Sequence, residues 1–383
     1  MKICPSLEGL FFACFFYQCV EHKSRYELFR LVILAALLVS GSGHASESGL
    51  PKNFASMPDD VQALLLEYAF FNDQVNLQWG EEASFASEKA YVKYLDDYLS
   101  RAKVDFDSGV LVVETLAVSE PKKQLKNAIV TALLTPDDPT GVDIYSATKV
   151  DANGKPFLLG QVLDQEGQPI NYEWRAKKFA DYLMQHSLRT HESESGLVYQ
   201  VRINLVKNRK QVAAKGVRAW VAQASHRFNL PESLILGIIE TESSFNPFAV
   251  SHANAYGLMQ IIPSTAGADV FQKTFKKSGQ PSRNYLFDAK NNITVGSAYL
   301  SILRDRYLRG VEHPTSQLYC IISAYNGGAG NVFKTFHSNR KQALKRINSL
   351  SPEDVLWRLR KQQPSHEARR YVEKVLANQK HYE

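Results

Sequence analysis

The sequence contains little cysteine. Of the four cysteines in 383 residues, Cys4, Cys14 and Cys19 lie near the amino terminus, so Cys320 is alone in the rest of the chain. If the amino-terminal stretch is removed, the one remaining thiol cannot close an internal disulfide. No CxxC pair occurs, and the ten histidines are scattered rather than grouped at metal-ligand spacing. We therefore predict no disulfide framework, no metal site and no cofactor.

The sequence also lacks a block of lysines and arginines interleaved with aromatic residues, which excludes the usual nucleic-acid binding surfaces. Its net charge is nevertheless +6. A mildly basic protein is attracted to an acidic polymer, and cell-wall glycan with its peptide carboxylates is one such polymer. The hydrophobic content of 44% and charged content of 22% are those of a globular protein, and the length is sufficient for two domains.

No apolar run near the amino terminus is long enough to span a bilayer stably. Lys23, Arg25 and Arg30 precede the apolar run 31–39, and small residues follow as far as Ala45. This order is typical of a signal segment, so we expect residues 1–45 to direct export, with a periplasmic location after cleavage. A second apolar run, 10–20, either lengthens the signal or reflects a start site placed too far upstream.

The remaining chain changes character once. Residues 46–58 are expected to be a linker and residues 59–206 an α+β domain. Residues 207–383 have helical periodicity almost throughout, which indicates an all-α domain. In the first domain we predict helices at 60–79, 91–99 and 124–134, and strands at 110–118, 157–163 and 197–206. In the second we predict helices at 212–228, 231–244, 264–275, 293–307, 316–325, 352–360 and 366–380.

One carboxylate lies where an apolar side chain would be expected. In the helix predicted at 231–244, the apolar face formed by Leu234, Ile235 and Ile238 continues to Glu242, whereas Glu240 points the opposite way and should be solvated. Apolar surroundings destabilise an ionised carboxylate, raise its pKa and suit it to general acid catalysis. An alternative stays open, in which Glu242 only marks the point where the apolar face meets water.

Four short motifs support the catalytic interpretation. They are Glu-Ser-Ser-Phe-Asn-Pro at 242–247, Gly-Leu-Met-Gln at 257–260, Ala-Tyr-Asn-Gly-Gly at 324–328 and Glu-Ala-Arg-Arg-Tyr-Val at 367–372. Their order and spacing resemble the signature of lytic murein transglycosylases with a goose-lysozyme-like helical domain. Segments 91–94, 104–107 and 177–183 resemble the amino-terminal domain of the membrane-bound lytic murein transglycosylase C family. The resemblance covers about residues 55–380.

The resemblance implies a role for each motif. Glu242 would be the catalytic residue. The positions implied to contact the saccharide are Ser251, Met259, Gln260, Ile262, Tyr325, Asn326, Glu367 and Tyr371. Two alternatives remain: Met259 and Ile262 are ordinary core residues, and Glu367 belongs to a solvated helix face. Lipoprotein members of the family carry a cysteine directly after the apolar run, and this chain has none there, so association with the outer membrane remains open.

The implied reaction is cleavage of the β-1,4 bond between N-acetylmuramic acid and N-acetylglucosamine in peptidoglycan strands, leaving a 1,6-anhydromuramic acid end. A lysozyme-type hydrolase on the same fold is the first alternative. It needs a second carboxylate or a positioned water, and Asp269 and Asp288 are candidates from sequence. A non-catalytic peptidoglycan-binding protein is the second alternative.

Overall fold

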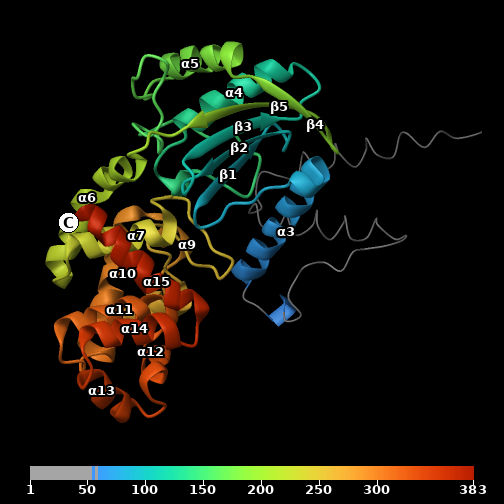
Figure 1. Cartoon of the computed structure of the whole chain (residues 1–383). Helices are drawn as coiled ribbons and strands as arrows, with labels where there is room; N and C mark the ends of the chain where they lie inside the picture. The colour runs from blue at the N-terminus through green and yellow to red at the C-terminus, as the bar shows by residue number, and fades with distance from the viewer. Residues whose placement is uncertain (1–53, 57–58) are drawn as a thin grey trace, which may run out of the picture. The chain divides into compact units, whose positions relative to one another are not determined.

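The structure is a computed structural model that describes residues 54–56 and 59–383 (Figure 1). The expected signal segment and most of the expected linker lie outside these residues. The chain divides into a first unit ending at Asp73 and a second unit from Gln74 to Glu383. Helix α3 (Asp59–Trp79), at the position predicted, starts in the first unit and follows the short turn η2 (Phe54–Ser56). Among the described residues no helix combines the length and apolarity needed to cross a membrane.

The second unit begins with an antiparallel sheet of five strands in the order β1-β2-β3-β5-β4. The strands are β1 (Ala90–Leu95), β2 (Ser100–Asp105), β3 (Val110–Thr115), β4 (Arg189–Ser193) and β5 (Gly196–Asn204). β3 pairs with β5 from Val110 opposite Asn204 to Thr115 opposite Tyr199. The long connection from β3 to β4 contains the helices that cover one face of the sheet.

These covering helices are α4 (Pro121–Leu134) and α5 (Glu173–His186), which lie together over the sheet in Figure 1. Alternate residues along the strands, such as Leu111 and Val113, are fully buried with Leu125 and Ile129 of α4. Burying one face while the alternate residues point away is the expected behaviour of an amphipathic strand.

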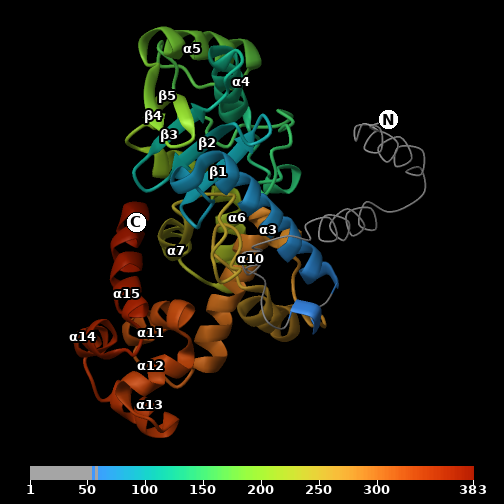
Figure 2. The same cartoon turned by 90° about the vertical axis from the view of Figure 1, so that its right-hand side faces the viewer.

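The rest of the chain is helical. The helices are α6 (Arg209–Phe228), α7 (Glu232–Ser243), α8 (Ala268–Val270), α9 (Arg283–Phe287), α10 (Ala289–Ile302), α11 (Pro314–Gly327), α12 (Ala329–Phe336), α13 (Arg340–Asn348), α14 (Pro352–Gln362) and α15 (His366–Gln379). Wider π-helical turns flank α8 at Pro263–Gly267 and Phe271–Phe275, and another extends α10 at Leu303–Tyr307. In Figure 2, α11, α12, α13 and α14 lie side by side.

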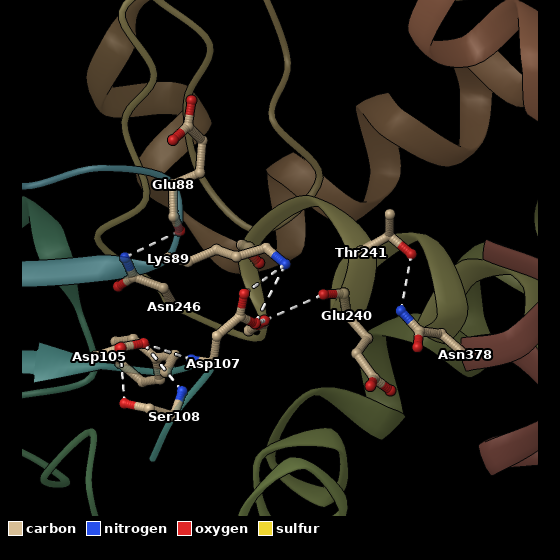
Figure 3. Close-up of polar contacts among 12 residues, drawn as sticks. Glu88, Lys89, Asp105, Asp107, Ser108, Glu240, Thr241, Asn246 and Asn378 are labelled. Carbon is tan, nitrogen blue, oxygen red and sulfur yellow. Dashed lines mark hydrogen bonds and ion pairs between the residues drawn. The ribbon is translucent and has the colours of Figure 1, made fainter. Parts of the chain in front are cut away.

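The approach of α15 to α7 positions the candidate site. A Cβ atom at Gly237, in the middle of α7, would lie 2.9 Å from the backbone nitrogen of Gln379. Glycine inside a helix normally costs stability, and here it allows the two helices to pack in close contact. The Asn378 side chain of α15 also donates a 3.0 Å hydrogen bond to the Thr241 hydroxyl of α7 (Figure 3).

The fold-class prediction is confirmed: an α+β region with a small antiparallel sheet precedes a helical region. The helix predicted at 91–99 is wrong, since residues 90–95 form β1 and pair with β2. The strand predicted at 157–163 is also wrong, because isolated bridges and turns replace it. The sequence analysis did not identify β2, β4, α5, α9, α12 or α13. In the first error the pairing with β2 outweighs the mixed local preference of Tyr91–Leu95.

Candidate active site

Glu242 lies in the last turn of α7. Pro231 precedes the helix, and Ser244 ends it with a left-handed backbone conformation (φ 49°). The half-buried Glu242 side chain accepts a 2.6 Å hydrogen bond from the Tyr371 hydroxyl of α15. Burial raises the pKa of Glu242 to about 8, although the Tyr371 bond opposes the shift, and the nearby Glu367 carboxylate adds to it. A carboxyl group that stays protonated at neutral pH can donate a proton to a substrate.

Tyr371 is suited to its contact with Glu242. Its side chain is 5% exposed, and burial, together with the neighbouring Glu242 charge, raises its pKa well above the ordinary value. The phenol therefore stays protonated and remains a donor. Since a hydrogen bond donated to a carboxylate favours the ionised form, Tyr371 limits how far burial raises the pKa of Glu242.

Tyr325 and Asn326, at the end of α11, also belong to this site. The Tyr325 hydroxyl donates a 2.9 Å hydrogen bond to the backbone oxygen of Met259, and the Asn326 amide donates a 2.8 Å bond to the Glu367 carboxylate. Burial and then the Glu242 charge raise the pKa of Tyr325 well above its ordinary value. The motifs at 242, 324–328 and 367–372, widely separated in sequence, therefore converge in space.

The loop after α7 has a different part in the site. Gln260 has a left-handed backbone (φ 47°), and its side-chain nitrogen donates to the backbone oxygens of Gly257 and Ala249 at 2.9 and 3.2 Å. Its side-chain oxygen has no protein partner. That oxygen is buried as well as unpartnered, so the structure does not expose it to a ligand.

The other predicted positions of this loop are less accessible. Met259 is fully buried, and its sulfur lies where a Cβ atom at Gly296 would be. Its side chain therefore supports the loop from the core and offers no surface to a sugar in this structure. The Ser251 hydroxyl accepts bonds from the backbone nitrogens of Ala253 and Ala255. Ile262 is half-buried directly before the π-helical turn.

Glu240 corrects a sequence prediction. Instead of being solvated, it is 1% exposed. Its carboxylate accepts bonds from Lys210 of α6 at 2.8 Å and from Tyr382 at 2.7 Å. Burial alone would raise the pKa of Glu240, but these partners hold it below the ordinary value. The helical pattern of α7 located its apolar face correctly but could not show that α6 and the carboxyl-terminal residues cover the opposite face.

Each of the other two candidate carboxylates has a hydrogen-bond partner with a structural role. Asp269 accepts a 2.6 Å bond from Lys273 on one oxygen and a 2.7 Å bond from Tyr307 on the other. Asp288 caps α10 by accepting a 2.7 Å bond from the backbone nitrogen of Asn291. Both have structural partners that account for them.

Sequence reasoning missed Asn292, whose side chain holds the loop that contains residues 257–260. This fully buried side chain accepts a 2.8 Å bond from the Met259 nitrogen and donates to the backbone oxygens of Tyr256 and Leu286. Gly257 has φ 73°, and a Cβ atom there would lie 2.4 Å from the Asn292 amide nitrogen. Glycine at this position therefore permits a close approach of the loop to Asn292.

Two further observations concern the described residues. They contain no group of three or more histidine, cysteine, aspartate or glutamate side chains that could hold a metal ion. A pocket of about 490 Å³ lies on the sheet and is lined by residues such as Val92, Lys103 and Arg202. No predicted site residue lines this pocket.

Two family models match this chain. Residues 219–348 match the family model described as the transglycosylase SLT domain, which places the helical part among the lytic transglycosylases. Residues 57–216 match the model described as the N-terminal domain of membrane-bound lytic murein transglycosylase C. The fourth motif, at 367–372, lies beyond both matches.

Relatives extend the match to almost the whole chain. Membrane-bound lytic murein transglycosylase C from Yersinia enterocolitica serotype O:8 / biotype 1B is 45% identical over 358 residues, which cover 93% of this chain and 99% of that protein. The protein of the same name from Yersinia pestis strain Pestoides F shows the same identity and coverage. The chain therefore belongs to the membrane-bound lytic murein transglycosylase C family, and it is an enzyme, a lytic transglycosylase acting on murein.

A solved structure also matches part of this chain. The 70 kDa soluble lytic transglycosylase from Escherichia coli is 26% identical, over 43% of this chain and 24% of that chain, with a TM-score of 0.34.

Proposed function

We propose that Glu242 is the single acid–base catalyst of this lytic transglycosylase. The observation that supports the assignment is a half-buried carboxyl group with a pKa of about 8 that is hydrogen-bonded by Tyr371. Such a group holds its proton at neutral pH and gives up or regains it as charge develops on the substrate. The two alternative carboxylates, Asp269 and Asp288, are bound elsewhere, which disfavours a mechanism with two carboxylates.

In the proposed reaction, Glu242 protonates the oxygen that joins N-acetylmuramic acid to N-acetylglucosamine, and the bond from muramic C1 to that oxygen breaks. The substrate's 2-acetamido group stabilises the cation at C1. The muramic C6 hydroxyl then attacks C1 and gives its proton to the ionised Glu242. The products are a 1,6-anhydromuramic acid end and a free N-acetylglucosamine 4-hydroxyl, and no water is consumed.

The surrounding residues would position this chemistry. Tyr371 orients the Glu242 carboxyl group, and the Asn326–Glu367 bond joins α11 to α15 beside it. Gln260 is proposed to contact the saccharide through its side-chain amide, whose buried and unpartnered oxygen would first have to be uncovered. Ser251, Ile262 and Tyr325 are proposed to shape the same saccharide site, whereas Met259 would act through the fold.

We further propose that an α+β domain spans residues 59–206 and the catalytic domain spans residues 207–383. Residues 1–45 would direct export to the periplasm, where peptidoglycan is the substrate. The Yersinia relatives are named as membrane-bound, and association of this protein with the outer membrane is part of the proposal. Its net charge of +6 favours contact with an acidic polymer or surface.

The test is mass spectrometry of fragments released from purified sacculi by the wild type, Glu242→Gln and Glu232→Gln. Glu232 lies in the first turn of the same helix. Glu232→Gln is the matched control because it is the same change of glutamate to glutamine. We expect anhydro fragments, lighter by one water than hydrolysis products, from the wild type and the control but not from Glu242→Gln. Anhydro products from a folded Glu242→Gln variant would refute the assignment, and reducing muramic acid ends from the wild type would indicate a hydrolase.

A further inference from the structure

The backbone directly after Glu242 is strained. Ser244 and Phe245 both adopt left-handed conformations, with φ of 49° and 66°. Residues other than glycine pay a steric cost there, because Cβ crowds the backbone. Two such residues in succession, two positions beyond the catalytic carboxyl group, require contacts that hold them in place.

Those contacts come from the amino-terminal part of the second unit. The Ser244 hydroxyl donates a 2.5 Å bond to the Asp107 carboxylate in the turn between β2 and β3. The Asn246 side chain donates to the backbone oxygens of Ser87 and Glu88 at 3.3 and 3.2 Å (Figure 3). One bond to the β2–β3 turn and two bonds to the segment before β1 therefore hold the residues that follow Glu242.

Aromatic packing strengthens the same junction. The ring of Phe248 lies 4.7 Å from that of Tyr91 in β1 and 5.3 Å from that of Phe157, measured between centroids. All three side chains are buried. Aromatic pairs at this spacing add to the stabilisation from burial, so the segment 244–248 is anchored at both of its ends.

Lys89 introduces charge at this junction. Its ammonium lies 3.2 and 3.1 Å from the two oxygens of Asp107 (Figure 3). The two side chains are 31% and 53% exposed, and exposed ion pairs contribute little to stability. The Lys89 charge also lowers the pKa of Glu242, although burial has the larger, opposite effect.

We propose that Asp107 is a positioning residue for the reaction: it binds the Lys89 ammonium, offsets its charge beside Glu242, and holds Ser244 so that the carboxyl group stays in place. The proposal rests on Glu242 as the acid–base catalyst. The amino-terminal region would thereby set the pH range in which the catalytic residue is protonated, in addition to supporting the fold.

The charged and titratable groups around Glu242 and Asp107 come from several elements. Tyr371 and Glu367 of α15, Tyr325 of α11, and Glu88 and Lys89 before β1 act on or respond to the charge of Glu242. Burial alone would raise the pKa of Asp107. The hydrogen bond from Ser244 and the charges of Lys89 and Lys210 outweigh burial and hold that pKa below its ordinary value. Asp107 therefore stays ionised throughout the working range and keeps Lys89 paired.

The test is the pH dependence of kcat/KM, because its high-pH limb reports the protonated catalytic acid in the free enzyme. Asp107→Asn keeps an acceptor for Ser244 but leaves the Lys89 charge unopposed, so the limb should move to lower pH by about half a unit or more. Lys89→Gln removes that charge and should move the limb to higher pH. With Lys89 already replaced, the Asp107→Asn shift should shrink by at least half.

The matched control is Asp105→Asn. Asp105 is the last residue of β2, directly before the same turn, and its carboxylate accepts bonds from the backbone of Asp107 and from Ser108 rather than from a lysine (Figure 3). Its substitution removes the same charge and should leave the limb in place. If Asp107 had only a structural role, Asp107→Asn would lower Tm and activity, and the high-pH limbs of Asp107→Asn and Lys89→Gln would not shift in opposite directions.

The proposal is overturned if the limbs of Asp107→Asn and Lys89→Gln do not move or move in the same direction. It is also overturned if Asp105→Asn shows a comparable shift, or if the Asp107→Asn shift is undiminished in the Lys89→Gln background. Glu242→Gln is assayed in parallel. If that variant is inactive while the limbs do not move, the positioning device is refuted and the catalytic assignment stands. If it remains active, the catalytic assignment fails and the device fails with it.

Discussion

Replacing Glu242 with glutamine should make the protein more stable at neutral pH while abolishing turnover. Burial keeps the pKa of Glu242 near 8, against an ordinary value of 4.5. The folded protein therefore binds a proton at Glu242 that the unfolded chain releases between these values. Stability falls as pH rises through that interval, because the folded state binds more protons than the unfolded state. Glutamine has no proton to lose, and its oxygen still accepts the bond from Tyr371.

The size of the effect follows from the pKa interval. One pKa unit corresponds to about 1.4 kcal/mol, so the interval from 4.5 to about 8 gives an upper bound of about 5 kcal/mol above pH 8. Glu242 is only half-buried, and water and relaxation reduce this bound. We expect Glu242→Gln to be more stable by about 1–3 kcal/mol at pH 8 and to match the wild type at pH 4.5.

The assay is thermal unfolding followed by circular dichroism at pH 4.5, 6, 7 and 8.5, with Glu232→Gln as the control. In a chain of this length the gain corresponds to a rise in Tm of a few degrees at pH 8.5. The difference between Glu242→Gln and the wild type should widen from pH 4.5 to 8.5, whereas Glu232→Gln should show no such trend. A difference that is constant with pH, or a wild type that is more stable at pH 8.5, would refute the reasoning.

Two further predictions concern the contact between α7 and α15. Tyr371→Phe removes a donor that stabilises ionised Glu242, so the high-pH limb of kcat/KM should move up by about one unit; a downward shift would contradict the stated role of Tyr371. Gly237→Ala places a Cβ atom 2.9 Å from the Gln379 backbone nitrogen and should destabilise the protein by about 1–3 kcal/mol, with reduced activity as Tyr371 moves from Glu242. Gly330 lies on α12 in open space, so Gly330→Ala should instead stabilise the protein by about 0.5–1 kcal/mol. If urea unfolding shows the same change in stability for Gly237→Ala and Gly330→Ala, the close approach of α15 is not the cause of the loss.

The local sequence pattern predicted most of the helical part. Apolar spacing placed α7 within one residue of each end. The same spacing directed attention to Glu242. The motifs around residues 257–260, 324–328 and 367–372 were identified because each is contiguous in the chain.

Local pattern was weaker in the α+β part. Residues 90–95 form a strand because six consecutive residues pair with β2, and a partner elsewhere in the chain is not visible in local preference. Glu240 and Met259 illustrate the same limit. The sequence identified each as polar or apolar, but burial of Glu240 depends on Lys210 and Tyr382, and burial of Met259 depends on Gly296.

The sequence by itself therefore determined the class of fold, the helix that carries the proposed catalytic carboxyl group, and the family. Only the tertiary structure decided which tyrosine bonds to Glu242, which of two neighbouring glutamates is fully buried, and that Asp107 bonds to Ser244 across 137 positions of chain. The physical reason is that periodicity reports one element at a time. The pKa of a carboxyl group and the strain in the backbone beside it depend instead on side chains that distant elements bring into contact.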